Sequence, residues 1–141
     1  MLIEARIENE RGRHGATLIT NGVAHSIPLQ PRPSGFGSAA NGGELLCLAL
    51  ATCYCNDIYR EAEKSGIEVV RVEVDAFAEF GEPGSPARRV FYRPTVTARA
   101  SETRIRELIL HTDRVAEIHN TLRRGMRVEL DGFIAKDADQ Q

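Results

Sequence analysis

Residues 41–66 read NGGELLCLALATCYCNDIYREAEKSG, and this stretch decides the fold. Asn41 is a residue type that caps helices, Glu44 stands three residues later as the reciprocal partner of a capping box, and Gly66 suits the left-handed position that ends a helix. The stretch therefore predicts one long helix. Its first half, Leu45–Tyr54, is apolar on every side, which predicts a core element with protein all around it.

The apolar run is too short to cross a membrane. Only about ten apolar residues precede Asn56 and Asp57, whereas a bilayer needs roughly 20. After Asn56 the pattern becomes amphipathic, with Ile58 and Ala62 set against charged neighbours. We therefore expect a buried helix and no membrane partner.

Composition bounds the class of protein. The chain has 141 residues, and we expect one domain spanning residues 1–141. Charged residues make up 27% of the chain and the formal net charge is -2, which excludes a general attraction to nucleic acid or anionic lipid. The opening MLIEARIENERGRHG carries no apolar signal core, so the expected compartment is the cytoplasm.

Alternating strands are expected on both sides of the helix in the chain. Before it, the pattern predicts strands at 2–8, 16–20 and 23–29, with a turn at 11–15 and a hairpin turn at Asn21-Gly22. After it, the pattern predicts a hairpin of 67–80 with 88–100, helices over 101–111 and 113–124 capped by Ser101 and Thr112, and a last strand at 126–134. This order predicts an α+β fold with the sheet on one side of the long helix.

The long helix needs more cover than one chain offers. A small sheet covers one face, and two short amphipathic helices cover part of the rest. A second copy of the chain is the expected remaining cover, because homodimers commonly bury surplus apolar surface.

All three cysteines, Cys47, Cys53 and Cys55, lie in the long helix. An odd number clustered in one helix does not form a disulfide framework, so we expect reduced thiols. At about 100° per residue the three thiols point in different directions or lie too far apart along the axis to share one ion. The four histidines are scattered singly. We expect no metal and no cofactor.

A single reactive thiol remains as the candidate chemistry. Cys53 lies where the helix passes from apolar to polar, one turn before Asp57, which favours a place at a pocket floor within reach of solvent. Cys47 lies in the apolar half and is expected to be structural. A reactive thiol needs a cation nearby, and Arg11 or Arg13 in the predicted turn is the candidate source. The cysteines and the arginines each have a non-functional alternative. A free cysteine is often a small buried hydrophobic residue, and an arginine in a turn is often a solvated surface charge.

Four motifs carry a resemblance to a known family. They are Glu44-Leu45-Leu46 before the apolar run to Cys53, Ala62-x-x-x-Gly66-Ile67-x-Val69 entering a strand, the Gly12-Arg13-His14-Gly15 turn, and Asn120-Thr121-Leu122 before the last strand. Together they resemble the OsmC/Ohr family of osmotically inducible and organic hydroperoxide resistance proteins. The resemblance covers nearly the whole chain.

The resemblance implies an intertwined α+β homodimer, with antiparallel sheets wrapped on a long buried central helix and active sites at the subunit interface. In the family's peroxidases a first cysteine attacks the peroxide, an arginine and a glutamate hold the thiolate, and a second cysteine resolves the sulfenic acid. The match places Cys53 at the attacking position and Arg13 at the arginine.

Two positions depart from the family's pattern. The glutamate position holds Gly43, while Glu44 belongs to its neighbour, and the position of the resolving cysteine holds Ala116. The two-cysteine cycle therefore cannot be written for this chain. A sulfenic acid on Cys53 would need an external thiol or would be over-oxidised.

Three hypotheses follow. The first is a hydroperoxide reductase that works by a one-cysteine route through Cys53 and Arg13, with an external thiol as reductant. The second is a non-catalytic dimer that binds a small apolar molecule in its interface pocket. The third is a structural dimer without a site. Whether Asp57 or Cys55 substitutes for the missing partners stays open at this stage.

Overall fold

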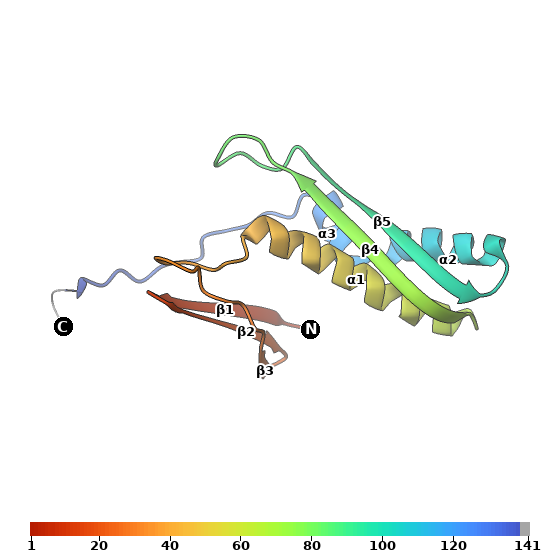
Figure 1. The fold of residues 1–141 in the computed structure, drawn as a ribbon, viewed down its shortest axis with the longest axis horizontal. Helices are drawn as coiled ribbons and strands as arrows, with labels where there is room; N and C mark the ends of the chain where they lie inside the picture. The colour runs from red at the N-terminus through yellow and green to blue at the C-terminus, as the bar shows by residue number, and fades with distance from the viewer. Residues whose placement is uncertain (139–141) are drawn as a thin grey trace. The chain divides into compact units, whose positions relative to one another are not determined.

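The computed structural model describes residues 1–138, so the last three residues of the expected domain lie outside it. Two compact units make up the chain. Unit 1 comprises Met1–Thr52 and Asp75–Arg93, and unit 2 comprises Cys53–Val74 and the chain from Pro94 onward. Helix α1 and the hairpin β4–β5 each contribute residues to both units (Figure 1).

Helix α1 spans Gly42–Lys64, which confirms the predicted long helix. The Asn41 side chain accepts a hydrogen bond from the Glu44 N–H at 2.9 Å, and Glu44 accepts the Asn41 N–H at 2.7 Å, so the capping box is formed. Gly66 has a φ of 63° and follows the last turn. The predicted capping box and the predicted left-handed glycine are thus both present at the ends of α1.

The first three strands form an antiparallel meander in the order β1-β2-β3, with β1 at Ile3–Glu10, β2 at Arg13–Thr20 and β3 at Val23–Ser26. The predicted Asn21-Gly22 turn is confirmed by φ values of 48° and 81°. The predicted wider turn at 11–15 was wrong. The turn is only Arg11-Gly12, because Gly12 reverses the chain with a φ of 73° and Glu10 pairs directly with Arg13. Arg13 is thus the first residue of a strand.

Strand β1, at one edge of this meander, has little cover. All eight residues of β1 are exposed, including Ile3 at 63% and Ile7 at 54%. In the neighbouring strand β2 only Ala16 is buried. Backbone pairing holds the three strands in register, but their apolar side chains gain little from burial within one chain.

Strands β4 (Glu68–Glu79) and β5 (Arg89–Arg99) pair antiparallel in a second sheet and confirm the predicted hairpin (Figure 1). From Val72 to Ala78 every second residue of β4 is half-buried and the residues between are exposed. This is the pattern expected of a strand with one covered face.

Two helices follow, α2 at Glu102–Val115 and α3 at Glu117–Arg123. The predicted cap at Ser101 is confirmed, since its side chain accepts the Arg104 N–H. The predicted cap at Thr112 was wrong, because α2 continues through Thr112 to Val115, with Ala116 as its C-cap. Thr112 is fully buried and its hydroxyl donates to the Leu108 carbonyl at 2.8 Å, so the side chain serves the helix interior.

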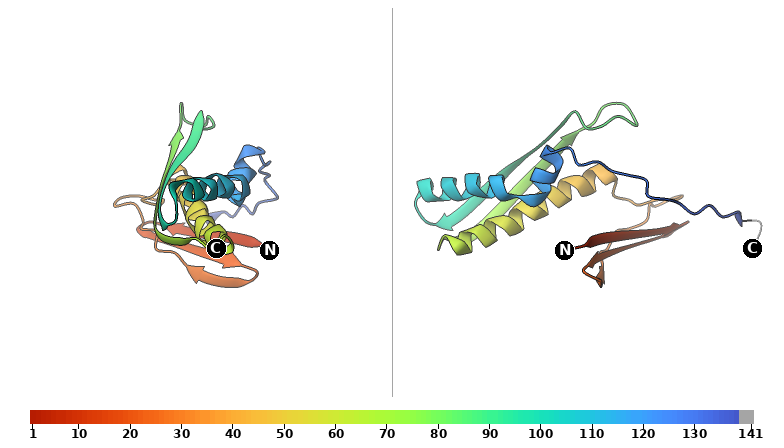
Figure 2. Two further views of the ribbon diagram at one scale, coloured as in Figure 1. Left: turned by 90° about the vertical axis from the view of Figure 1, so that its right-hand side faces the viewer. Right: turned by 180° about the vertical axis from the view of Figure 1, so that it is seen from behind.

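The predicted last strand at 126–134 was also wrong. Within residues 1–138 no strand lies beyond Arg99, and residues 126–137 form neither helix nor strand (Figure 2). Val128 and Leu130, apolar members of the alternating pattern, are 94% and 84% exposed. Alternation alone does not make a strand, because the backbone groups of a strand need a neighbour to bond.

The core of unit 2 packs the second half of α1 against α2 and α3. Tyr54, Ile58 and Thr112 are fully buried, and the Tyr54 hydroxyl donates to the Ile109 carbonyl at 2.9 Å. The first half of α1 has less cover, since Leu50 is buried but Leu48 is 52% exposed. In residues 1–138 no helix combines the length and the hydropathy that a bilayer crossing would need.

Candidate functional site

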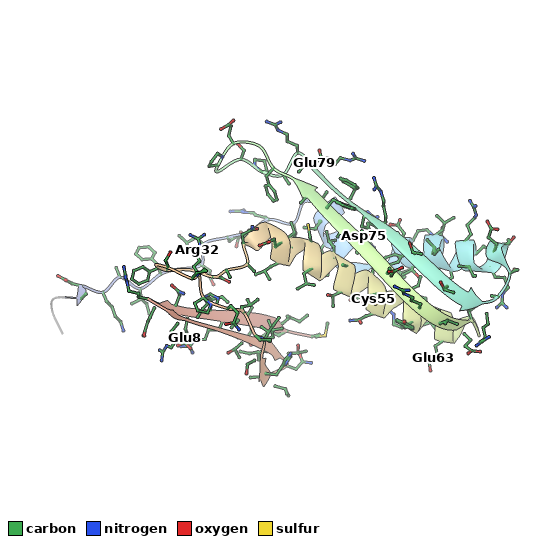
Figure 3. All side chains as sticks on the ribbon, in the orientation of Figure 1. Glu8, Arg32, Cys55, Glu63, Asp75 and Glu79 are labelled. Atoms are coloured by element: carbon green, nitrogen blue, oxygen red, sulfur yellow. The ribbon has the colours of Figure 1, made fainter. Side chains whose placement is uncertain are left out.

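The predicted nucleophile, Cys53, lies on α1 in unit 2 and is half-buried. Its thiol donates a hydrogen bond to Oδ2 of Asp57 at 3.5 Å. The two residues are four apart, which places both side chains on the same face of the helix. The helix therefore gives the sulfur a carboxylate neighbour without help from any other element. Figure 3 shows the side chains along α1, with Cys55 labelled.

Asp57 is itself held by a cation. It is 4% exposed, and its Oδ1 accepts from Nη1 of Arg60 at 2.7 Å. The two carboxylate oxygens thus have different partners, the thiol on one side and the guanidinium on the other. A buried carboxylate with both a cation and a hydrogen-bond donor keeps its charge at acceptable cost.

A second buried carboxylate extends this network to α2. Glu61 is 5% exposed and accepts from Arg60 at 2.9 Å and from Lys64 at 2.8 Å. Its other oxygen lies 3.0 Å from Nε2 of His111 on α2. The hydrogen bonds from Lys64, Arg60 and His111 lower the pKa of Glu61 to about 2. Hydrogen bonds therefore run from the Cys53 thiol through two carboxylates to a histidine of the next helix.

The surroundings of Cys53 favour the neutral thiol. Burial raises the pKa of the Cys53 thiol above its ordinary value, and the negative charge of Asp57 raises it further. Backbone hydrogen bonds from Ile118 and Glu117, at the start of α3, act in the opposite direction but do not cancel the increase. Within one chain Cys53 is thus mostly protonated at neutral pH, and a cation would be needed to make it a strong nucleophile.

The predicted cation, Arg13, lies at the start of β2 in unit 1. Its side chain is 76% exposed and reaches Glu10 at 3.3 Å, a weak surface pair. An arginine so lightly held is available for another partner. Cys53 and Arg13 belong to different units, so their pairing stays a prediction.

Phe80 and Asn41 leave little room beside Gly43, the position that the resemblance gives to a glutamate. A Cβ atom at Gly43 would lie 3.0 Å from Cε2 of Phe80 and 3.2 Å from Oδ1 of Asn41, so a larger residue would have to displace the ring. The neighbouring Glu44 accepts the Asn41 N–H in the capping box. That role in the capping box sets its carboxylate at the N-terminus of α1.

The position of the missing resolving cysteine falls in the same surroundings as Cys53. Ala116 is fully buried and forms the junction between α2 and α3. The two residues that follow it, Glu117 and Ile118, are those whose backbone bonds reach the Cys53 sulfur. The chain therefore places a methyl group where the resemblance places a second thiol.

Sequence analysis named Asp57 only as an open question and missed Arg60 and His119. The spacing of three residues between Asp57 and Arg60 was a readable signal for an ion pair on one helix face. His119 on α3 is 4% exposed and lies with its ring centroid 5.9 Å from that of Tyr54, a contact no spacing could reveal. Among residues 1–138 no group of three or more His, Cys, Asp or Glu side chains is placed to hold a metal ion.

These elements define an α+β protein built on one long helix that carries three free cysteines. The chain belongs to the family of OsmC-like proteins, whose family model matches residues 35–131. This confirms the resemblance found in the motifs. A search of curated proteins gave no match.

Solved structures of this family share the fold. An OsmC-like protein from Mycoplasma pneumoniae is 20% identical, with 85% of this chain and 87% of that chain covered and a TM-score of 0.59. An organic hydroperoxide resistance protein OsmC from Legionella pneumophila is 18% identical over 87% and 90% of the two chains, with a TM-score of 0.58. The organic hydroperoxide resistance protein OhrB of Bacillus subtilis is 15% identical over 89% and 93%, with a TM-score of 0.54. At these identities the likeness shows the fold alone.

Proposed function

We propose that the protein is a cytoplasmic homodimer that reduces organic hydroperoxides through one cysteine, Cys53, with an external thiol as reductant. The observation that carries this proposal is the position of the Cys53 sulfur, half-buried and hydrogen-bonded to Asp57. The names of two structural relatives, both organic hydroperoxide resistance proteins, support the substrate class.

The reaction has two stages. The sulfur of Cys53 attacks one peroxide oxygen, the O–O bond breaks, and the products are an alcohol and a sulfenic acid on Cys53. Because residue 116 is alanine, an external thiol then attacks the sulfenic sulfur and water leaves. A second external thiol releases Cys53 from the mixed disulfide. Each peroxide thus consumes two external thiols.

In this proposal Arg13, a residue of unit 1, supplies the positive charge that unit 2 does not place beside Cys53. The raised pKa of the Cys53 thiol, caused first by burial, makes such a cation necessary. A second copy of the chain would also cover the exposed apolar side chains of β1 and the first half of α1. We therefore place the complete site in the dimer.

The test compares three matched variants, Cys53→Ser, Cys47→Ser and Cys55→Ser, because all three thiols are free and half-buried on the same helix. Consumption of an alkyl hydroperoxide is measured with an excess of a small dithiol. Cys53→Ser is expected to fall to the rate of the dithiol alone, while the other two variants keep the activity. A dimedone-type probe should label the sulfenic acid on Cys53 only. Unchanged activity in Cys53→Ser would remove the proposal.

A second candidate function rests on the same raised pKa. A thiol held neutral by burial is also what a packing residue beside an apolar ligand would be. Alkylation at neutral pH separates the two. A Cys53 that reacts no faster than a free small-molecule thiol, and forms no sulfenic acid with peroxide, favours a non-catalytic dimer that binds a small apolar molecule.

A further inference from the structure

Asp57 is the hydrogen-bond acceptor of the Cys53 thiol. Oδ2 of Asp57 accepts from the thiol at 3.5 Å, and no intervening residue is needed because both side chains come from one helix face. Oδ1 is occupied by Arg60 at 2.7 Å. The carboxylate is therefore oriented, with one oxygen fixed by the guanidinium and the other directed at the sulfur.

The guanidinium that orients Asp57 is itself anchored. Arg60 donates from Nε to Glu61 at 2.9 Å, and Glu61 is in turn bonded to Lys64 and faces His111 of α2. Both carboxylates are at least 95% buried, since Asp57 is 4% and Glu61 is 5% exposed. Side chains this buried and this bonded move little, which is the condition for a positioned proton acceptor.

The charged groups that act on this site come from three elements, α1, α2 and α3, and α2 contributes Asp113, whose negative charge raises the pKa of His119. Helix α1 supplies Arg60 beside Asp57, and α3 supplies His119, whose charged form is favoured by Asp57 but disfavoured by burial and by Arg123. Burial and Arg123 lower the pKa of His119, so at neutral pH its ring adds little charge. Arg60 is thus the main cation next to Asp57 within unit 2.

We propose that Asp57 is the general base of the proposed reaction, taking the proton of the Cys53 thiol as the sulfur attacks the peroxide. The S–H bond breaks, the S–O bond forms and the O–O bond breaks, so that sulfur is oxidised and the peroxide is reduced. The proton on Asp57 then passes to the departing alkoxide, which leaves as the alcohol. The step is balanced, because the thiol and the hydroperoxide become a sulfenic acid and an alcohol. This inference rests on the proposed function.

The role of a base makes a prediction that a structural role does not. If Asp57 only lies beside the sulfur, its negative charge keeps the thiol protonated. Removing that charge should then raise the rate of every reaction of Cys53. A base contributes about a hundredfold or more to the step it assists. Asp57→Asn should therefore change two rates in opposite directions. Alkylation of Cys53 at pH 7 should become faster, because the negative charge is lost, while formation of the sulfenic acid should become about a hundredfold slower.

The experiment measures both rates by mass spectrometry on the full-length protein, for wild type, Asp57→Asn and Asp57→Glu. Asp57→Glu keeps a carboxylate and is expected to recover part of the peroxide rate. If both rates of Asp57→Asn rise together, or if both stay at the wild-type values, Asp57 is not the base. If Cys53→Ser is inactive but Asp57→Asn reacts at the wild-type rates, the proposed function stands and only this inference is overturned.

A second measurement keeps the inference testable if Asp57→Asn fails to fold. Sulfenic acid formation in the wild-type protein is measured in H2O and in D2O, with viscosity matched by glycerol. Proton transfer in the attacking step predicts a slower reaction in D2O. Equal rates in the two solvents would overturn the proposal.

Discussion

The β1–β3 meander and the helical part of unit 2 are stabilised in different ways. In the meander, eight paired residues of β1 are held by backbone hydrogen bonds while every one of them stays exposed. In unit 2, Tyr54, Ile58 and Thr112 are fully buried. Hydrogen bonding fixes the register of a sheet, but burial of apolar surface supplies most of the stability. The register of the meander is thus fixed by backbone pairing within one chain, while the apolar side chains of β1 stay exposed.

The residues of the proposed site are divided between the same two regions. Cys53 and Asp57 lie in the packed unit 2, whereas Arg13 lies on the exposed meander. The packed region holds the thiol in hydrogen-bond contact with a buried carboxylate, and the exposed strand offers a cation that is held only by a surface pair. Cover of the meander by a second subunit would serve stability and the site together.

The largest expected effect compares two isoleucines. Ile58→Ala, in the core of unit 2, should lower the free energy of unfolding by about 2–5 kcal/mol, because it opens a cavity where the side chain is fully buried. Ile7→Ala, at 54% exposure on β1, should cost under about 1 kcal/mol in a single chain. Chemical denaturation measures both.

The same two substitutions test whether a second copy of the chain packs on the meander. If a second copy packs on β1, the cost of Ile7→Ala should approach that of Ile58→Ala at high protein concentration and should shrink toward its single-chain value as dilution dissociates the dimer. An Ile7→Ala cost that is small and independent of protein concentration would show that β1 remains uncovered in solution.

The second prediction concerns the buried charge network of unit 2. Glu61→Gln should cost about 1–3 kcal/mol, because it weakens the bonds to Lys64, Arg60 and His111 inside the fold. Since the pKa of Glu61 is lowered from 4.5 to about 2, its contribution is complete above pH 4.5 and is lost as the pH falls toward 2. The melting temperature of the wild type should therefore fall more over this acid range than that of the variant.

The matched control is Glu63→Gln, an exposed carboxylate of the same helix (Figure 3). It should behave as the wild type at every pH. Equal acid sensitivity of the wild type and Glu61→Gln would contradict the role assigned to the network.

The smallest expected change in stability comes from the meander's surface charges. Arg13→Ala and Arg6→Ala remove arginines that are 76% and 70% exposed in similar surface pairs, and each should cost under about 0.5 kcal/mol. Their effects on Cys53 should differ. If Arg13 stabilises the thiolate, its loss should slow alkylation at neutral pH by about tenfold, equivalent to one pKa unit, and Arg6→Ala should leave the rate unchanged. Identical rates in both variants would exclude Arg13 from the site.

Sequence reasoning succeeded where a signal and its partner are close in the chain. Asn41 with Glu44, Ser101 with Arg104, and the Asn21-Gly22 turn all formed as predicted. It failed where a local signal competed with packing. Thr112 could cap a helix by composition, but its side chain was buried and bonded within α2 instead.

Taken by itself, the sequence determined the ends of α1, the hairpins, the family and the candidate thiol, because each depends on residues a few positions apart or on motifs in order along the chain. Only the tertiary structure decided that Glu61 meets His111 across 50 residues, that Phe80 lies close to Gly43, and that residues 126–134 form no strand. The physical reason is that backbone preferences act locally, whereas burial and charge pairing depend on which distant segments the fold brings together.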